Sequence, residues 1–243
     1  WCWKANGSGS ANTAGSINTT ATSANTTSGF SIMTYTGNGV GGATLGHGLG
    51  IVPHMMIFKH RETIGEWWDT YHQANGNEYT LFLNSTDAKG DQIYYYDTTP
   101  TSTLVTVAGV GSINDDGELY VAYIFAPVQG FSKFGSYTGN DNANGTFVYT
   151  GFSPAWVMTK KTSASGASWQ ICDNKRPGYN IINDTLLANS TAVEATHDAI
   201  DFCSNGFKCK NSNRDSNHIA DYIYAAFAEA PFVNSNGVPC NAR

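Results

Sequence analysis

Short apolar runs separated by turn residues dominate the pattern of hydrophobic and polar positions along this chain. The runs are rich in β-branched and aromatic residues, and Gly, Asn or Pro stand at their ends. Runs of about four to eight residues with this composition are typical of strands in a β-sandwich. In the first half of the chain they predict strands at residues 30–35, 55–58, 79–83, 104–107 and 119–125. Helical character is confined to one turn at residues 191–198, so the pattern predicts an all-β protein.

The same pattern occurs twice, with matching segments roughly 100 residues apart. The matched segments are Gly29-Phe30-Ser31 and Gly130-Phe131-Ser132, Tyr35-Thr36-Gly37-Asn38 and Tyr137-Thr138-Gly139-Asn140, Trp68 and Trp169, and Tyr120-Val121-Ala122-Tyr123 and Tyr222-Ile223-Tyr224-Ala225. Because the matches keep one order, they predict an internal duplication. We expect two tandem antiparallel β-sandwich modules, of jelly-roll or immunoglobulin-like type, at residues 29–128 and 129–233, followed by a C-terminal tail at residues 234–243. The last strand of each module is apolar on both faces, which predicts a central, covered strand.

The first 28 residues lie outside this repeat. Trp1-Cys2-Trp3 precedes a Gly-Phe-Ser in the same way as the last strand of the first module does, so residues 1–4 are interpreted as the last strand of an upstream module. Such an orphan strand could complete the sheet of a neighbouring molecule, which makes Trp1, Cys2 and Trp3 candidate assembly residues. Residues 5–28 contain only small and polar residues apart from Ile17. They predict a linker, with a polar strand that lies on another element as the alternative.

Charge and composition exclude several classes of partner. The 243 residues include 13 Lys and Arg against 19 Asp and Glu, a formal charge of −6, and only 13% of residues are charged. So few basic residues cannot neutralise many phosphates, so we expect no nucleic-acid partner. No apolar run approaches the roughly 20 residues that cross a bilayer, so we expect no membrane insertion.

Motifs for catalysis or metal binding are weak. The residues 114–118 carry oxygen ligands and a Gly, but a hairpin turn explains them better than a calcium loop. No spacing of His, Cys or acidic residues predicts a metal, a cofactor or a catalytic nucleophile. The five cysteines are expected to be mainly buried free thiols, with a Cys203–Cys209 disulfide as the alternative; they are Cys2, Cys172, Cys203, Cys209 and Cys240.

Aromatic residues are the strongest candidates for ligand binding. Trp67 precedes Trp68, and three tyrosines follow one another at residues 94–96. On a strand, successive rings point to opposite faces, so at least one ring of each set should face solvent. Exposed Trp and Tyr beside polar side chains form a common platform for a sugar ring. Packing against a second face or a neighbouring copy is the alternative. The candidate saccharide-binding residues are Trp67, Tyr94, Tyr95 and Tyr96.

Several long segments resemble a repeated module of uncharacterised function in virion proteins of tailed phages, especially marine ones. They lie at residues 1–7, 23–32, 35–39, 46–53 and 130–140. The resemblance implies a β-rich part of a tail fibre or a related appendage on the surface of the virion. It also implies contacts with other virion subunits and a homo-oligomer, which is usually a trimer in phage fibres. Relatives tend to have apolar residues at the positions of Cys172, Cys203 and Cys209, and the resemblance supplies no catalytic or binding residue.

Three functional hypotheses follow. The first is a non-enzymatic virion protein that attaches to the host surface, with a cell-surface glycan as its partner. The second is a purely structural subunit of a capsid decoration or an extracellular filament, assembled by strand addition through residues 1–4. The third is a glycan-degrading appendage enzyme, which needs two carboxylates about 5–10 Å apart. Its candidate acids are two clusters, Asp115-Asp116-Glu118 and Glu62/Glu66/Asp69.

Overall fold

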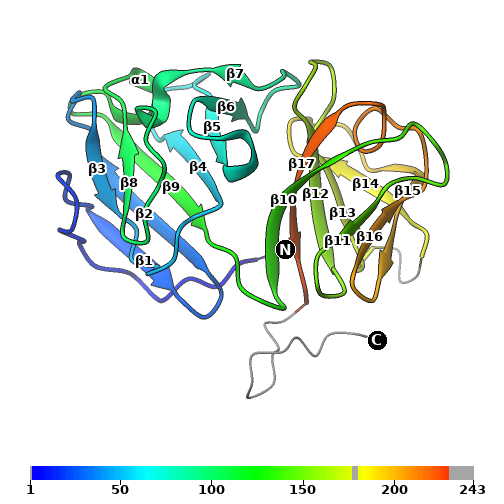
Figure 1. Cartoon of the computed structure of the whole chain (residues 1–243). Helices are drawn as coiled ribbons and strands as arrows, with labels where there is room; N and C mark the ends of the chain where they lie inside the picture. The colour runs from blue at the N-terminus through cyan, green and yellow to red at the C-terminus, as the bar shows by residue number, and fades with distance from the viewer. Residues whose placement is uncertain (1, 177–179, 230–243) are drawn as a thin grey trace. The chain divides into compact units, whose positions relative to one another are not determined.

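The computed structural model describes residues 2–176 and 180–229, and these form an all-β protein (Figure 1). In this part of the chain the single α-helix is a short turn, α1 (Gly111–Asn114), and two 3₁₀ turns, η1 (Gln73–Asn75) and η2 (Ile93–Tyr95), accompany the strands. The chain divides into two compact units. The first comprises residues 1–83 and 90–127, and the second comprises residues 84–89 and 128–243. Each unit is described by itself.

The main sheet of the first unit has seven antiparallel strands. In spatial order they are β1 (Ala21–Asn25), β2 (Phe30–Thr36), β9 (Leu119–Phe125), β4 (Met55–His60), β5 (Trp68–His72), β6 (Tyr79–Phe82) and β7 (Gly90–Asp91). The last strand along the chain, β9, lies between β2 and β4, which confirms the prediction that this strand is central. Val121 and Tyr123 are only half-buried, so the prediction that both faces of the strand are covered is wrong for β9.

A second layer covers one face of this sheet. It consists of β3 (Ala43–Gly46) and β8 (Leu104–Val107), which pair with each other. Leu45 and Val105 of this layer belong to one apolar cluster with Met33 and Phe58 of the main sheet, and all four side chains are fully buried. Two antiparallel layers around one apolar core are the arrangement that alternating strands produce. The first unit is therefore a β-sandwich.

Residues 5–28 are part of the first unit, so the predicted linker is wrong. β1 pairs with β2 along its whole length, and Ile17 is buried in the core. Hydroxyl groups replace the missing apolar contacts: the Ser23 hydroxyl accepts a hydrogen bond from the Asn6 N–H at 2.8 Å and donates one to the Gly7 carbonyl at 2.8 Å. The alternative of a polar strand lying on another element describes β1 correctly.

The second unit has one sheet of eight antiparallel strands. In spatial order they are β10 (Ser132–Thr138), β17 (Asp221–Phe227), β12 (Trp156–Lys161), β13 (Gln170–Asp173), β14 (Ile182–Leu187), β15 (Ala195–Cys203), β16 (Gly206–Cys209) and β11 (Phe147–Tyr149). The predicted helical turn at residues 191–198 is wrong, because Ala195 begins β15.

This sheet curls into a nearly closed barrel (Figure 1). Side chains connect its two edges, β10 and β11. The Lys133 ammonium donates to the Tyr149 carbonyl at 2.8 Å, and the Thr146 hydroxyl donates to the Thr138 carbonyl at 2.9 Å. These bonds satisfy carbonyl groups that an open sheet edge would leave without partners. The second unit thus departs from the predicted two-sheet sandwich.

The two units share a strand order and a set of hydrogen bonds. The order β2-β9-β4-β5-β6 in the first unit corresponds to β10-β17-β12-β13-β14 in the second. Tyr35 stacks on Tyr120 with ring centroids 5.2 Å apart, and Tyr137 stacks on Tyr222 at 5.1 Å. The two stacks also match in their hydroxyl bonds, which run to the backbone carbonyls of Ile113, Gly111, Ser216 and Arg214.

The structure changes one predicted domain boundary, and the predicted segments at the two ends of the chain lie wholly or partly outside the described residues. Residues 84–89 belong to the second unit, where the Lys89 N–H donates to the Thr162 carbonyl at 3.1 Å, so the first predicted module is interrupted. Trp1 and the predicted tail at residues 234–243 lie outside the described residues. Within the described residues, no helix is long and apolar enough to cross a membrane.

Candidate functional site: an aromatic row beside a buried carboxyl

Three aromatic side chains form a row in the first unit. Trp67 lies directly before β5, Phe82 ends β6, and Tyr94 belongs to η2. The ring centroids of Trp67 and Phe82 are 4.7 Å apart with the planes tilted by 31°, and those of Phe82 and Tyr94 are 6.5 Å apart. Trp67 is 40% exposed, whereas Phe82 and Tyr94 are half-buried. We call these residues the aromatic row.

The row contains two of the four predicted ligand residues. Trp67 and Tyr94 are far apart in the sequence, and Phe82 connects them. Phe82 is the residue that the sequence did not single out, because it ends an ordinary apolar run. Its position follows from the pairing of Asp69 with Phe82 between β5 and β6, since cross-strand partners lie on one face.

Tyr95 and Tyr96 are not part of the row. The expected strand at residues 94–96 is wrong, because η2 turns the backbone through three residues per turn and points the three rings in different directions. Tyr95 is fully buried, with its hydroxyl 3.0 Å from the Thr80 hydroxyl. Tyr96 has a left-handed backbone with φ 52° and lies against Gly41 and Gly42.

A buried carboxyl lies beside the row. Asp69 is fully buried in β5, between Phe58 and Phe82 on the neighbouring strands. Neither carboxylate oxygen has a hydrogen-bond partner of ordinary geometry among the described residues. Burial raises the pKa of Asp69 to about 7, and the nearby Ser112 hydroxyl of α1 offsets part of that rise. Burial raises the pKa of Tyr94 as well, and the charge of Asp69 adds to the shift.

The matching place in the second unit holds an amide instead of a carboxyl. Gln170 begins β13 directly after Trp169, as Asp69 follows Trp68 in β5, and both strands take the same place in the strand order. Gln170 is also buried. The second unit therefore has no counterpart of the buried acid at this position.

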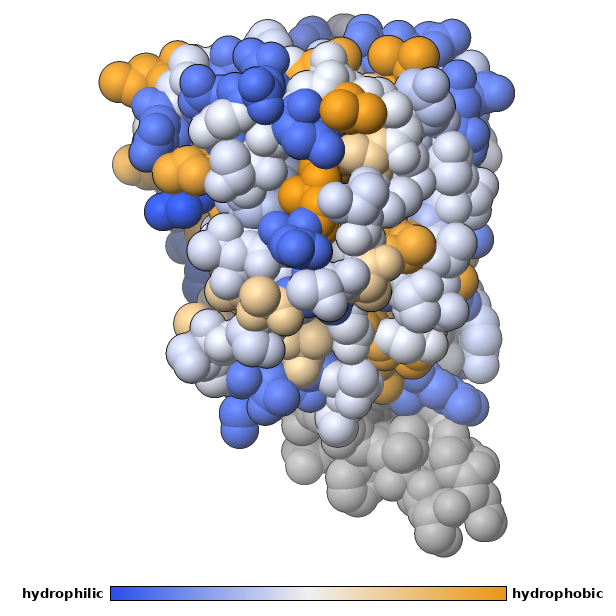
Figure 2. All heavy atoms as spheres, turned by 90° about the vertical axis from the view of Figure 1, so that its left-hand side faces the viewer, coloured by the Kyte–Doolittle hydropathy of each residue, from blue (hydrophilic) through white to orange (hydrophobic). Residues whose placement is uncertain are grey.

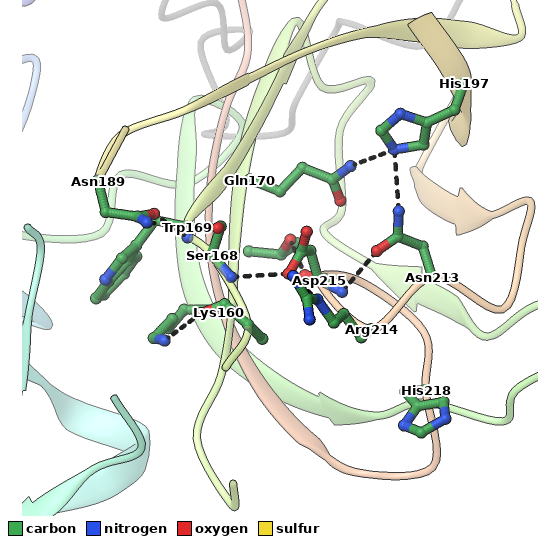
Figure 3. Close-up of polar contacts among 12 residues, drawn as sticks. Lys160, Ser168, Trp169, Gln170, Asn189, His197, Asn213, Arg214, Asp215 and His218 are labelled. Carbon is green, nitrogen blue, oxygen red and sulfur yellow. Dashed lines mark hydrogen bonds and ion pairs between the residues drawn. The ribbon is translucent and has the colours of Figure 1, made fainter. Parts of the chain in front are cut away.

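Gln170 belongs to a hydrogen-bonded network (Figure 3). Its amide nitrogen lies 3.1 Å from His197 Nε2, and Asn213 Nδ2 lies 3.2 Å from the same atom. The Asp215 N–H donates to Asn213 Oδ1 at 2.8 Å, which fixes the Asn213 amide so that its nitrogen faces the histidine. His197 Nε2 must then accept, and its proton lies on Nδ1. Asp215 Oδ1 accepts a hydrogen bond from the Ser168 N–H at 2.7 Å, so the carboxylate in this network binds a backbone group.

A lysine in each unit also donates a hydrogen bond to a backbone carbonyl. Lys160 is fully buried and donates to the Ala167 carbonyl at 2.6 Å, and Lys59 donates to the Glu66 carbonyl at 3.1 Å. Burial lowers the pKa of Lys160 to about 8, and the charge of Asp215 opposes that shift. Each ammonium group stabilises the loop that follows its own strand.

Comparison of the sequence with known protein families gives one match. A single family model, Domain of unknown function (DUF7483), matches residues 1–231. The chain belongs to the DUF7483 family. No curated protein and no solved structure matches this DUF7483 chain.

The cysteines of the DUF7483 chain are free where they are described. Cys172 and Cys209 are buried, as expected, and burial raises the pKa of the Cys209 thiol to about 12. Cys203 lies opposite Gly206 and Cys209 opposite Ile200, so the proposed Cys203–Cys209 pair does not face each other across the hairpin. Cys2 is exposed, and Cys240 lies outside the described residues.

The N-terminal residues lie along the main sheet of the first unit. Cys2, Trp3 and Lys4 form no strand in the described structure. The Trp3 ring packs edge-on against Phe125 with centroids 5.6 Å apart. The Lys4 carbonyl accepts hydrogen bonds from Asn25 Nδ2 and from the Ser28 hydroxyl, each at 3.1 Å. An open apolar groove of about 490 Å³ lies beside them, lined by Cys2, Trp3, Ala5, Phe30, Ile32, Ile57, Tyr123 and Phe125.

The acidic residues of the first cluster in the DUF7483 chain differ in their burial. Asp69 is buried, whereas Glu62 is exposed and Glu66 is half-buried. Residues 115–118 lie between α1 and β9 and form a turn, with Gly117 at φ 79°. The predicted hairpin is wrong, because β8 pairs with β3 whereas β9 pairs with β2 and β4. In the described part of the chain, no group of three or more His, Cys, Asp or Glu side chains is placed to hold a metal ion.

Proposed function

We propose that the chain is a non-enzymatic virion protein, part of a tail fibre or related appendage, that attaches to a saccharide on the host surface through the aromatic row. The aromatic row carries this proposal. Trp67 presents a large apolar ring to solvent, and the half-buried Phe82 and Tyr94 extend it. A saccharide offers apolar C–H faces and a polar rim, so stacked rings beside polar groups suit it. The virion context rests on the resemblance of the sequence to appendage modules.

We also propose that the two units descend from one duplicated module. The shared strand order and the matched tyrosine stacks support the duplication. A tandem of similar β units can present several surfaces. This organisation suits a protein that displays binding sites outward.

One face of the first unit also fits a localised contact. On the face drawn in Figure 2, hydrophobic residues lie in small separate groups among polar ones. Scattered apolar residues are ordinary for a soluble surface, whereas a large continuous patch indicates a protein interface. A small aromatic contact is therefore the feature of this unit that we assign to ligand binding.

Removing the indole ring of Trp67 should weaken saccharide binding. A glycan array with the full chain identifies the saccharide, and a titration then compares Trp67→Ala with the wild type. We expect about a tenfold loss of affinity or more, because an exposed stacking ring dominates such contacts. Tyr96→Ala is the matched control, because Tyr96 is exposed but does not belong to the row. Equal affinities of wild type and Trp67→Ala, or no binding to any saccharide, would contradict the proposal.

A second candidate function is assembly through the N-terminal residues. The contact of Trp3 with Phe125 beside an open apolar groove favours it, because the same contact could form with a second copy. Deletion of residues 1–4 is then expected to abolish self-association, measured by sedimentation, while the thermal unfolding of the chain is retained. Unchanged self-association in the deletion variant would reject strand or segment exchange.

A glycan-cleaving activity has less support. It needs two carboxylates that reach the substrate, and Asp69 is fully buried beneath the row. Incubation of the identified saccharide with the chain should release no new reducing ends.

A further inference from the structure

The edge strand β11 of the second unit exposes two aromatic rings. Phe147 is 46% exposed and Tyr149 is 59% exposed, whereas Val148 between them is buried. Because side chains alternate along a strand, the two rings share the outward face and start about 7 Å apart along it. Among the described strands, β11 pairs only with β16. The two rings therefore lie side by side at an accessible margin of the sheet.

The neighbouring strand leaves these rings uncovered. Gly206 lies opposite Tyr149, and Lys208 lies opposite Phe147. A Cβ at Gly206 would approach the Val148 carbonyl oxygen to 2.1 Å and Phe147 Cζ to 3.0 Å. The Phe147 ring thus lies across a position where a side chain does not fit. Both rings are therefore open to solvent on this face.

Two ammonium groups border this surface. Lys133 Nζ lies 5.1 Å from the centroid of the Tyr149 ring and donates to the Tyr149 carbonyl at 2.8 Å. Lys208 Nζ donates to Asn144 Oδ1 at 2.5 Å. An ammonium group has three donors, so each lysine keeps donors for a ligand. The acid in the same row is Asp201, opposite Lys208, and Lys210 already neutralises it at 3.2 Å.

We propose that this face, the β11 platform of Phe147, Tyr149, Lys133 and Lys208, binds an acidic saccharide. The two rings stack on the apolar faces of sugar units, and the lysines bind carboxylate groups on the same polymer. In a chain with a formal charge of −6, a local excess of ammonium groups beside exposed rings selects an anion rather than a neutral sugar. The platform goes beyond the proposed function, because it lies in the other unit and takes a different class of saccharide.

Affinity electrophoresis of the full chain in gels containing polygalacturonate tests this assignment, with gels containing dextran as the neutral comparison. We expect polygalacturonate to slow the migration of the wild type, and high salt to reduce this retardation. The β11 platform should cause no retardation in dextran gels. Tyr149→Ala and Lys208→Gln should each weaken the retardation by about tenfold. Lys4→Gln is the matched control for charge, because it removes one ammonium group in the other unit and should change little.

The same gels separate this assignment from the proposed function. Trp67→Ala should retain binding to polygalacturonate, since Trp67 belongs to the aromatic row. Three results would overturn the β11 platform: no retardation of the wild type, equal losses in Lys4→Gln and Lys208→Gln, or a loss in Trp67→Ala but not in Tyr149→Ala. A change of oligomeric state in Tyr149→Ala without polygalacturonate binding by the wild type would also overturn it, and would identify the face as an interface between copies. Lys208→Gln keeps the test valid if Tyr149→Ala does not fold, as judged by thermal unfolding.

Discussion

Asp69→Asn should stabilise the protein by about 2–4 kcal/mol at pH 8, because the wild type must then hold an uncompensated charge in its core. Asp69 is fully buried, and burial raises its pKa from 3.8 to about 7. The folded state therefore binds the proton more tightly than the unfolded state does. The stability that protonation supplies is fully present below about pH 4 and is lost as the pH rises toward 7. Asparagine resembles the protonated form at every pH.

The measurement is the free energy of unfolding by urea for both proteins between pH 4 and pH 8. The difference in free energy of unfolding between the two proteins should be small at pH 4 and should grow as the pH rises to 7. Taking this difference cancels the contribution of the titrating groups that both proteins share. Those nearest to Asp69 are Glu66, Lys59, Tyr35, Tyr94 and Tyr95. Asp116→Asn is the matched control, because Asp116 is exposed in a turn of the same unit and should give a difference near zero at every pH. A destabilised Asp69→Asn at pH 8 would contradict an unpartnered carboxylate.

Asn217→Ala is expected to destabilise the protein by about 3 kcal/mol or more, because it removes a fully buried amide that holds several backbone groups together. Asn217 Oδ1 accepts from the Asn140 N–H at 3.2 Å. Its amide nitrogen carries two hydrogens and has three acceptors within hydrogen-bond distance: Asn140 Oδ1 at 2.9 Å, the Asn142 carbonyl at 2.9 Å and the Asn211 carbonyl at 2.6 Å. Alanine leaves each of these groups without this partner, and it leaves a space where the buried amide was.

Urea unfolding also measures this loss, with Asn205→Ala as the control. Asn205 lies in the exposed turn before β16, so its replacement should change the free energy of unfolding by less than about 0.5 kcal/mol. Equal effects of the two substitutions would show that the Asn217 amide does not hold the two segments together.

The repeated Tyr-Thr-Gly-Asn segment shows how much of the fold the sequence contains. In the first unit Tyr35 bonds to the Ile113 carbonyl, Gly37 leaves no room for a side chain against the Asp115 carbonyl, and Asn38 pairs with Asn114. The second unit repeats these contacts with Tyr137, Gly139, Asn140 and Asn217. A motif that recurs with its spacing therefore identifies the turn that closes each unit, and the alternating apolar runs locate the central strands.

Other elements escaped prediction for physical reasons. β1 contains no large apolar residue, so the apolar pattern does not predict it. Hydroxyl and amide groups hold it to its neighbours instead. Residues 93–95 have the composition of a strand, but tertiary packing that buries Tyr95 bends them into η2. β15 contains charged and polar residues, so its sequence lacks the apolar pattern that would predict a strand paired with β14 and β16.

The candidate site was predictable only in part. Trp67 and Tyr94 could be selected as aromatic residues beside polar ones, but only the register of β5 and β6 places Phe82 between them. Asp69 looked like one acid of a surface cluster, and its burial depends on α1 and η2, which the apolar pattern does not show. The platform at β11 depends on a glycine opposite an aromatic residue, and this too is a property of register.

Indole N–H resonances give the most direct test of saccharide binding at the aromatic row. The chain has six tryptophans, and the Trp67 resonance is assigned by its disappearance in Trp67→Phe. On titration with the saccharide that the array identifies, our account predicts that the Trp67 indole resonance shifts with saturation while those of the buried Trp156 and Trp169 stay in place. A bound saccharide that leaves Trp67 unmoved would contradict the account.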